Sequence, residues 1–183
     1  MKFEFGQTIP GLKIRGKEAN YPVMDERSVR AGAGIMLMLA LFAFSHAFLT
    51  KNFAYLNIFV LLFFTEFLIR VAINPDYAPI YILGRYLVRK QEPEWVGAIQ
   101  KRFAWTLGLI MAGSMIIIVP ILQIRGALPL SICSICIFLL WAESTLGICV
   151  GCKIYSWLIK IGILKPKVRA ACPGGACELK FDK

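Results

Sequence analysis

Histidine, acidic residues and nucleotide-binding motifs are scarce in this sequence, and each shortage excludes a class of function. Histidine occurs once in 183 residues, so one chain cannot hold a haem between two of its own histidines. It has no glycine-rich phosphate loop and no serine–histidine–aspartate set, which argues against a self-contained pump or hydrolase. Internal repeats and low-complexity segments are also lacking.

Acidic residues number 11 against 21 lysines and arginines, which gives a net charge of +10. These basic residues flank long apolar stretches, where membrane orientation and anionic lipid explain them better than a nucleic acid does. We therefore expect no nucleic-acid partner. Residues 1–30 are polar and lack the apolar region and cleavage site of a signal peptide, so the first apolar helix is expected to direct insertion into the lipid bilayer.

Apolar residues make up 58% of the chain and are concentrated in blocks, as in membrane proteins. The blocks predict an all-α integral membrane protein, a four-transmembrane-helix bundle. Its spans are expected at about 31–49, 53–73, 103–123 and 128–150, within a membrane domain of residues 31–164 that follows the lead-in 1–30 and precedes a tail, 165–183.

The basic residues also predict the orientation of the bundle. Eighteen of them lie in residues 1–30, 74–102 and 153–183, and two lie in the turns 50–52 and 124–127. The positive-inside rule then places both termini in the cytosol, with the protein in the bacterial cytoplasmic membrane.

Two cytosolic segments are apolar without being spans. Residues 80–90, IYILGRYLVRK, are expected to form an amphipathic helix on the membrane surface. Residues 148–164 carry two lysines and are interpreted as a cytosolic extension of the fourth helix or as an interfacial helix.

Three acidic or basic residues of the Asp, Glu, Lys and Arg types fall within the expected spans. Glu66 and Arg70 are one helical turn apart and can pair. The sequence is compatible with a structural role of this ion pair and with a functional one. Glu143 lies at a similar depth, so the three side chains could share one bundle interior as a proton or ion-pair site. Lys101 and Arg102 are interpreted as an ordinary cytosolic anchor.

The six cysteines form three spaced pairs. They are Cys133 with Cys136, Cys149 with Cys152, and Cys172 with Cys177. A C-x-x-C pair on a helix can form a redox disulfide or offer two ligands to a soft metal. In one straight helix the first two pairs would lie about 24 Å apart, so a shared site would need a break, with Gly147 or Gly151 as the expected place.

These pairs leave three hypotheses open. In a thiol–disulfide or sulfur-handling protein, Cys133, Cys136, Cys149 and Cys152 would be the catalytic residues. In a metal-binding protein, Cys149, Cys152, Cys172 and Cys177 would hold zinc or an iron–sulfur cluster at a cytosolic site. In a small accessory subunit of a larger membrane complex, the cysteines would be structural or would face the lipid.

Four stretches of the sequence are similar to a known family. They are MDERSVRAGAGI at 24–35, IRVAINPDYAPI at 69–80, PEWVGAIQKRFAW at 93–105, and the C-x-x-C and GICVGCKIY segments of the fourth helix. In order and spacing they resemble an uncharacterised bacterial membrane family, catalogued as domain of unknown function 4395. The resemblance implies a four-helix membrane protein with polar motifs on the cytosolic side. Some relatives are joined to or lie beside thioredoxin-like or sulfur-transfer domains, which makes such a protein a candidate partner.

Overall fold

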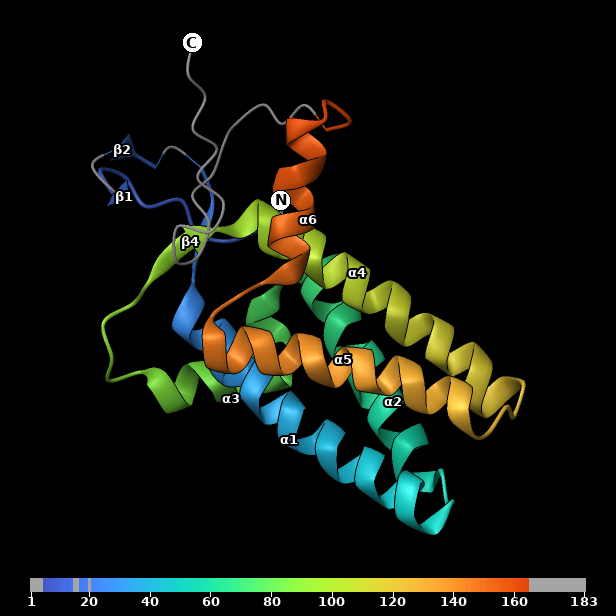
Figure 1. The fold of residues 1–183 in the computed structure, drawn as a ribbon. Coiled ribbons are helices and arrows are strands. Elements are labelled where there is room, and N and C mark those ends of the chain that lie inside the picture. The colour runs from blue at the N-terminus through green and yellow to red at the C-terminus, as the bar shows by residue number, and fades with distance from the viewer. Residues whose placement is uncertain (1–4, 15–16, 20, 165–183) are drawn as a thin grey trace.

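The structure, a computed structural model, describes residues 5–14, 17–19 and 21–164. Helices dominate it (Figure 1). The α-helices are α1 (Glu26–Thr50), α2 (Ala54–Leu68), α3 (Pro79–Val88), α4 (Ala98–Ile116), α5 (Ala127–Leu146) and α6 (Val150–Lys160). Wider π-helical turns, Ile69–Ile73 and Ile117–Ile121, extend α2 and α4, and a short 3-10 helix, Pro75–Tyr77, precedes α3.

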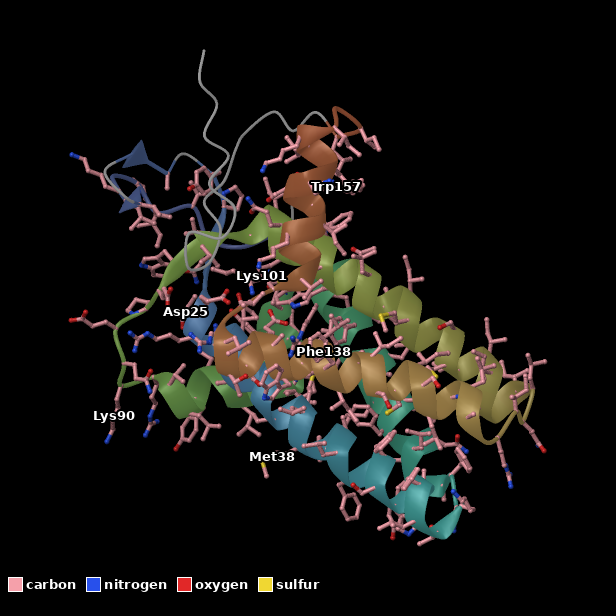
Figure 2. The ribbon with its side chains drawn as sticks, viewed as in Figure 1. Asp25, Met38, Lys90, Lys101, Phe138 and Trp157 are labelled. Atoms are coloured by element: carbon pink, nitrogen blue, oxygen red, sulfur yellow. The ribbon has the colours of Figure 1, made fainter. Side chains whose placement is uncertain are left out.

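Four of these helices are long and apolar enough to cross a membrane: α1, α2 with its π turn, α4 with its π turn, and α5. Large apolar side chains, including Met38 and Phe138, are exposed on their outer faces, as expected of a surface that lipid covers (Figure 2). The described residues thus form a helical membrane bundle, as the apolar blocks predicted.

The helices begin and end at different residues from those expected. α4 begins at Ala98, earlier than its apolar block indicated, and α5 ends at Leu146 rather than near 150. α1 begins before its apolar block too, at Glu26, where the acidic residues Asp25 and Glu26 are suited to start a helix. Charged side chains in these first turns find partners inside the protein, so the helices continue beyond their apolar stretches. Asp25 caps α1 by accepting hydrogen bonds from the backbone N–H groups of Arg27 and Ser28.

The other helices pack against α1 on the side where its small residues lie. Ala33, Ala40, Ala43 and Ala47 are buried at helical spacing, which allows other helices to approach closely. α1 packs against α3, α5 and α2, while α2 also packs against α4. α4 and α5 are joined by a short turn but scarcely touch each other along their lengths (Figure 1).

A two-stranded antiparallel sheet ties the beginnings of α1 and α4 together. β3 (Val23–Asp25) runs directly into α1, and β4 (Trp95–Gly97) runs directly into α4. Met24 pairs with Val96 in this sheet. The pairing places the first turns of two helices that are distant in sequence side by side. A second small sheet, β1 (Lys13–Ile14) with β2 (Lys17–Glu18), lies in the N-terminal segment.

α3 lies against α1 without a gap at Gly84. A Cβ atom built there would lie 2.6 Å from the backbone N of Gly32 and 2.8 Å from the carbonyl oxygen of Ser28. Ile80 and Tyr81 are buried on the same side, whereas Leu83 and Leu87 are exposed. The expected amphipathic helix is therefore present, with one face fixed to the bundle.

The fourth span ends at Gly147, which has a left-handed conformation with φ of 65°. α6 is a separate helix of 11 residues, about 16 Å long at the usual rise, which is too short to span a bilayer. The expected continuous extension of the fourth helix is therefore wrong, because the helix breaks at Gly147, one of the two places where a shared cysteine site would need a break. Glycine suits this position because a left-handed residue at a helix end rarely has a Cβ atom.

We expect Gly84→Ala to destabilise the protein by about 1–3 kcal/mol, because the added methyl group meets the backbone of α1. Gly113→Ala is the matched control, since its Cβ atom would lie 3.6 Å from a side-chain atom of Phe64, an ordinary contact. Thermal unfolding in mild detergent measures both. Equal melting temperatures for the two variants would contradict the close packing of α3 on α1.

Candidate functional site

A buried ammonium group, that of Lys101, lies at the end of the bundle where α1 and α4 begin and α5 ends. Its Nζ is 3.0 Å from Oε1 and 2.8 Å from Oε2 of Glu26 and 2.8 Å from Oε1 of Glu143. The Lys101 side chain is completely buried, that of Glu26 is 1% exposed and that of Glu143 is 17% exposed. We call these three residues the Lys101 cluster.

Backbone interactions hold the cluster together. The β3–β4 pairing sets Glu26, the first residue of α1, near Lys101 in the first turn of α4. Arg30 donates hydrogen bonds to the carbonyl oxygens of Ser144 and Thr145, at 3.5 and 3.2 Å, and so holds the end of α5 against α1. Because Glu143 is near the end of α5, these hydrogen bonds also keep its carboxylate in contact with the Lys101 ammonium group. Figure 2 shows Lys101 inside the protein, whereas Lys90 and Trp157 point outward.

Cys149 and Cys152 lie beside this cluster, at the beginning of α6. Cys149 is the residue that precedes the helix and Cys152 is in its first turn. A hydrogen bond with Cys149, together with burial, raises the pKa of the Cys152 thiol well above its usual range. The Lys101 ammonium interacts electrostatically with both sulfur atoms. A C-x-x-C pair at a helix N-terminus beside a cation is a typical setting for reactive cysteines.

Close packing of α6 on α4 keeps the pair in place. A Cβ atom at Gly151 would lie 2.6 Å from the Cβ of Ala104, so only glycine lets the two helices meet here. Cys152 is 1% exposed and Cys149 is 7% exposed. Cys149 is therefore the more accessible thiol, and Cys152 lies behind it.

An apolar groove of about 340 Å³ runs from this pair toward the middle of the bundle. It lies between α2, α4, α5 and α6, where α4 and α5 separate. Cys149 and Glu143 form part of its lining, and Cys136 contributes from further along α5. Cys136, Leu140 and Glu143 follow one another at about one helical turn along α5, and all three line this cavity. Because of the break at Gly147, one thiol of each C-x-x-C pair reaches the same groove.

The surroundings of Cys133 differ from those of Cys149. Cys133 is buried, and a small cavity there is lined, besides Cys136, by Phe59, Val60, Phe63, Met111, Ala112 and Met115. No acid or base belongs to this lining. None of the four cysteines in the described part of the chain takes part in a disulfide. Cys133 thus has the environment of a small apolar side chain, and its catalytic role stays a prediction.

Glu66 and Arg70 form an ion pair of their own. Oε1 of Glu66 accepts hydrogen bonds from Nε and Nη2 of Arg70, at 3.0 and 2.6 Å. The same carboxylate also accepts the backbone N–H groups of Ile80 and Tyr81, at 3.1 and 3.0 Å. The Arg70 guanidinium lies 5.1 Å from the ring centre of Trp105. These contacts fix the first turn of α3 and favour the structural interpretation. Glu143 pairs with Lys101 instead of joining this pair.

The model of one protein family, described as "Domain of unknown function (DUF4395)", matches residues 24–160. The chain belongs to this family. The match confirms the resemblance seen in the sequence motifs, and it includes the Lys101 cluster and both C-x-x-C pairs. Comparisons with curated proteins and with solved structures found no match.

The predicted metal site of this DUF4395 chain depends partly on residues that the structure does not describe. Cys172 and Cys177 both lie outside the described residues, as does the rest of the segment 165–183. Within the described part, no group of three or more histidine, cysteine, aspartate or glutamate residues is placed to hold a metal ion. The four-thiolate site with Cys149 and Cys152 stays a prediction.

Sequence reasoning missed two central residues of the site, Lys101 and Glu26. The interpretation of Lys101 as an ordinary cytosolic anchor is wrong, because its side chain is completely buried and paired with two carboxylates. From the sequence, Glu26 is recognisable only as an acidic residue suited to the first turn of a helix. One feature of the sequence indicated their pairing: the motifs DERSVR and GAIQKRF each place a charged residue, Glu26 and Lys101, close to the beginning of a span. Their pairing depends on the β3–β4 contact, which involves only three residues from each strand.

We expect Lys101→Met to cost about 3–5 kcal/mol of stability, because it leaves the buried carboxylate of Glu26 and the partly buried one of Glu143 without their cation. Lys153→Met is the control, since Lys153 is exposed on α6. Adding Glu26→Gln and Glu143→Gln to Lys101→Met should recover part of the loss. Thermal unfolding in mild detergent measures all three proteins. Identical curves for Lys101→Met and Lys153→Met would contradict a stabilising role for the cluster.

Proposed function

We propose that this chain is a membrane thiol–disulfide exchange or sulfur-handling protein whose working dithiol is Cys149 and Cys152. One observation carries the proposal: the two thiols are hydrogen-bonded at the start of a helix, beside a buried ammonium group, and only one of them lines an open groove. The Cys133–Cys136 pair lacks a charged neighbour among the residues of its cavity, so its role would be secondary.

The two cysteines have different tasks in this proposal. Cys149, the more accessible thiol, attacks a sulfur atom of the substrate disulfide and forms a mixed disulfide, and one substrate thiol leaves. Cys152 then attacks the Cys149 sulfur, which releases the second substrate thiol and leaves a Cys149–Cys152 disulfide. The two electrons of the dithiol thus reduce the substrate.

In this proposal the Lys101 cluster accepts the proton that Cys152 must lose before it attacks. The raised pKa of Cys152 keeps this thiol protonated near neutral pH, so it needs a base before it can attack. Glu143 is close enough to interact with Cys152 electrostatically. Two carboxylates facing one ammonium group leave one negative charge in excess, so the cluster can accept the proton of Cys152 without losing its ion pair.

The placement of the site indicates how partners reach it. The charge distribution of the sequence favours a cytosolic position for both termini, and the Lys101 cluster and α6 would then lie at the cytosolic end of the bundle. A soluble thioredoxin-like or sulfur-transfer protein of the bacterial cytosol could exchange electrons or sulfur with Cys149 there. The four apolar helices would anchor this exchange site in the cytoplasmic membrane.

A test with oxidised glutathione separates the tasks of the two thiols. We expect the reduced protein to form a Cys149–Cys152 disulfide. Cys152→Ser should stop at a mixed disulfide between Cys149 and glutathione, because the second thiol is missing. Cys149→Ser should react slowly near neutral pH, because the remaining Cys152 is only 1% exposed and this burial raises the pKa of its thiol. Mass spectrometry of alkylated peptides identifies each product.

Cys133→Ser is the matched control, since it removes a thiol but leaves Cys149 and Cys152 intact, and it should behave like the parent. Six free thiols after oxidant treatment would contradict exchange and favour an accessory subunit. Metal analysis of the same anaerobic sample tests the remaining alternative. About one zinc, or one iron–sulfur cluster, per chain with four protected thiols would contradict exchange and favour a site that includes Cys172 and Cys177.

A further inference from the structure

We propose that the groove beside Cys149 binds a lipid-soluble quinone, which oxidises the Cys149–Cys152 dithiol. This inference rests on the proposed function and gives the exchange its direction: the quinone oxidises the Cys149–Cys152 dithiol, and the disulfide so formed then oxidises a partner dithiol by the same two exchange steps in reverse. It is argued from the position of the groove, the character of its lining and the chemistry at its polar end.

The position of the groove gives access to molecules dissolved in the membrane. Ile110 and Met111 of α4 and Leu139 of α5 line it, and all three belong to helices long enough to span a bilayer. Ile110 is 62% exposed, so the lining continues onto the outer apolar surface of the bundle. An occupant can therefore enter sideways from the lipid. A water-soluble disulfide would gain nothing from such a lining.

The lining is suited to a flat ring with an apolar substituent. Phe63, Phe67 and Trp105 supply aromatic surface on the α2 and α4 sides, and the rings of Phe63 and Phe67 lie 4.5 Å apart. Small-molecule sites are usually apolar cavities of roughly 300–1,000 Å³ with a few polar groups. The volume of about 340 Å³ falls at the lower end of that range, which favours a single ring with part of its tail.

The polar end of the groove selects the chemistry of the occupant. Cys149 and Glu143 are in the lining, with Lys101 and Cys152 directly behind them. A phospholipid acyl chain would make no use of a dithiol and a carboxylate. A quinone would use both, because its reduction consumes two electrons and two protons.

The reaction balances with these groups alone. Two S–H bonds break and one S–S bond forms between Cys149 and Cys152, which are together oxidised by two electrons. The quinone ring takes up these electrons, and its two carbonyl oxygens become hydroxyl groups. The two thiol protons end on those oxygens, and Glu143 is placed to pass them on. The products are a disulfide and a hydroquinone that returns to the membrane.

The test uses the full chain, reduced and then freed of reductant under anaerobic conditions, in phosphatidylethanolamine–phosphatidylglycerol nanodiscs. The probe is decyl-ubiquinone, whose fully substituted ring resists direct addition of thiols. We expect one hydroquinone for each Cys149–Cys152 disulfide, measured by ultraviolet absorbance and peptide mapping. Cys149→Ser should produce none.

Leu139→Trp places a large side chain in the groove, and Ile135→Trp, one turn away on α5, is the matched control on the exposed surface. We expect Leu139→Trp to react with the quinone about tenfold more slowly or worse, because the ring loses its space. Ile135→Trp should keep the parent rate. All three proteins should be oxidised by glutathione disulfide at equal rates.

A second measurement needs no variant. The dimethyl ether of decyl-ubiquinol has the same ring and tail but accepts no electrons, so it should slow the quinone reaction and leave the glutathione reaction unchanged. Lack of competition, or equal quinone rates for the two tryptophan variants, would overturn the quinone site. Oxidation by glutathione disulfide but not by quinone would also overturn it while the proposed function stands. Failure of both oxidants would overturn the proposed function itself.

Discussion

The burial of one positive charge, the ammonium group of Lys101, constrains the whole end of the bundle. A cation removed from water needs anions in direct contact, and here they come from the beginning of α1 and the end of α5. Both helix ends must therefore meet the first turn of α4. The β3–β4 pairing and the hydrogen bonds from Arg30 to α5 satisfy this requirement through the backbone. The thiol pair and the groove lie where these elements converge.

The two groups of paired charges inside the bundle, Glu66 with Arg70 and the Lys101 cluster, have different surroundings. Glu66 and Arg70 are occupied in fixing α3, since the carboxylate also accepts two backbone N–H groups of that helix. The Lys101 cluster instead borders a groove and two thiols. In a membrane domain, polar groups away from water must find internal partners. Only the second cluster combines such pairing with access to a possible reactant, which is why the proposed chemistry is assigned to it.

The sequence allowed much of this architecture to be predicted. Apolar runs long enough for a bilayer gave four helices, and the tight turn between the first two spans made them antiparallel. Cys136, Leu140 and Glu143 are about one helical turn apart, so they share one side of the fourth helix because helical periodicity is a local property, and all three line the groove. A break at Gly147 was one of two positions considered for the fourth helix, since glycine tolerates a left-handed conformation.

The sequence by itself determined the helices, the apolar surface and the pairing of Glu66 with Arg70, because these depend on residues within one or two turns of each other. Only the tertiary structure decided that Lys101 is buried, that Glu26 and Glu143 neutralise it, and that Cys136 and Cys149 share one groove. Those contacts join residues up to 75 positions apart. They arise from a short strand pairing and from the angle at which α6 leaves α5, and neither feature has a repeating pattern along the chain.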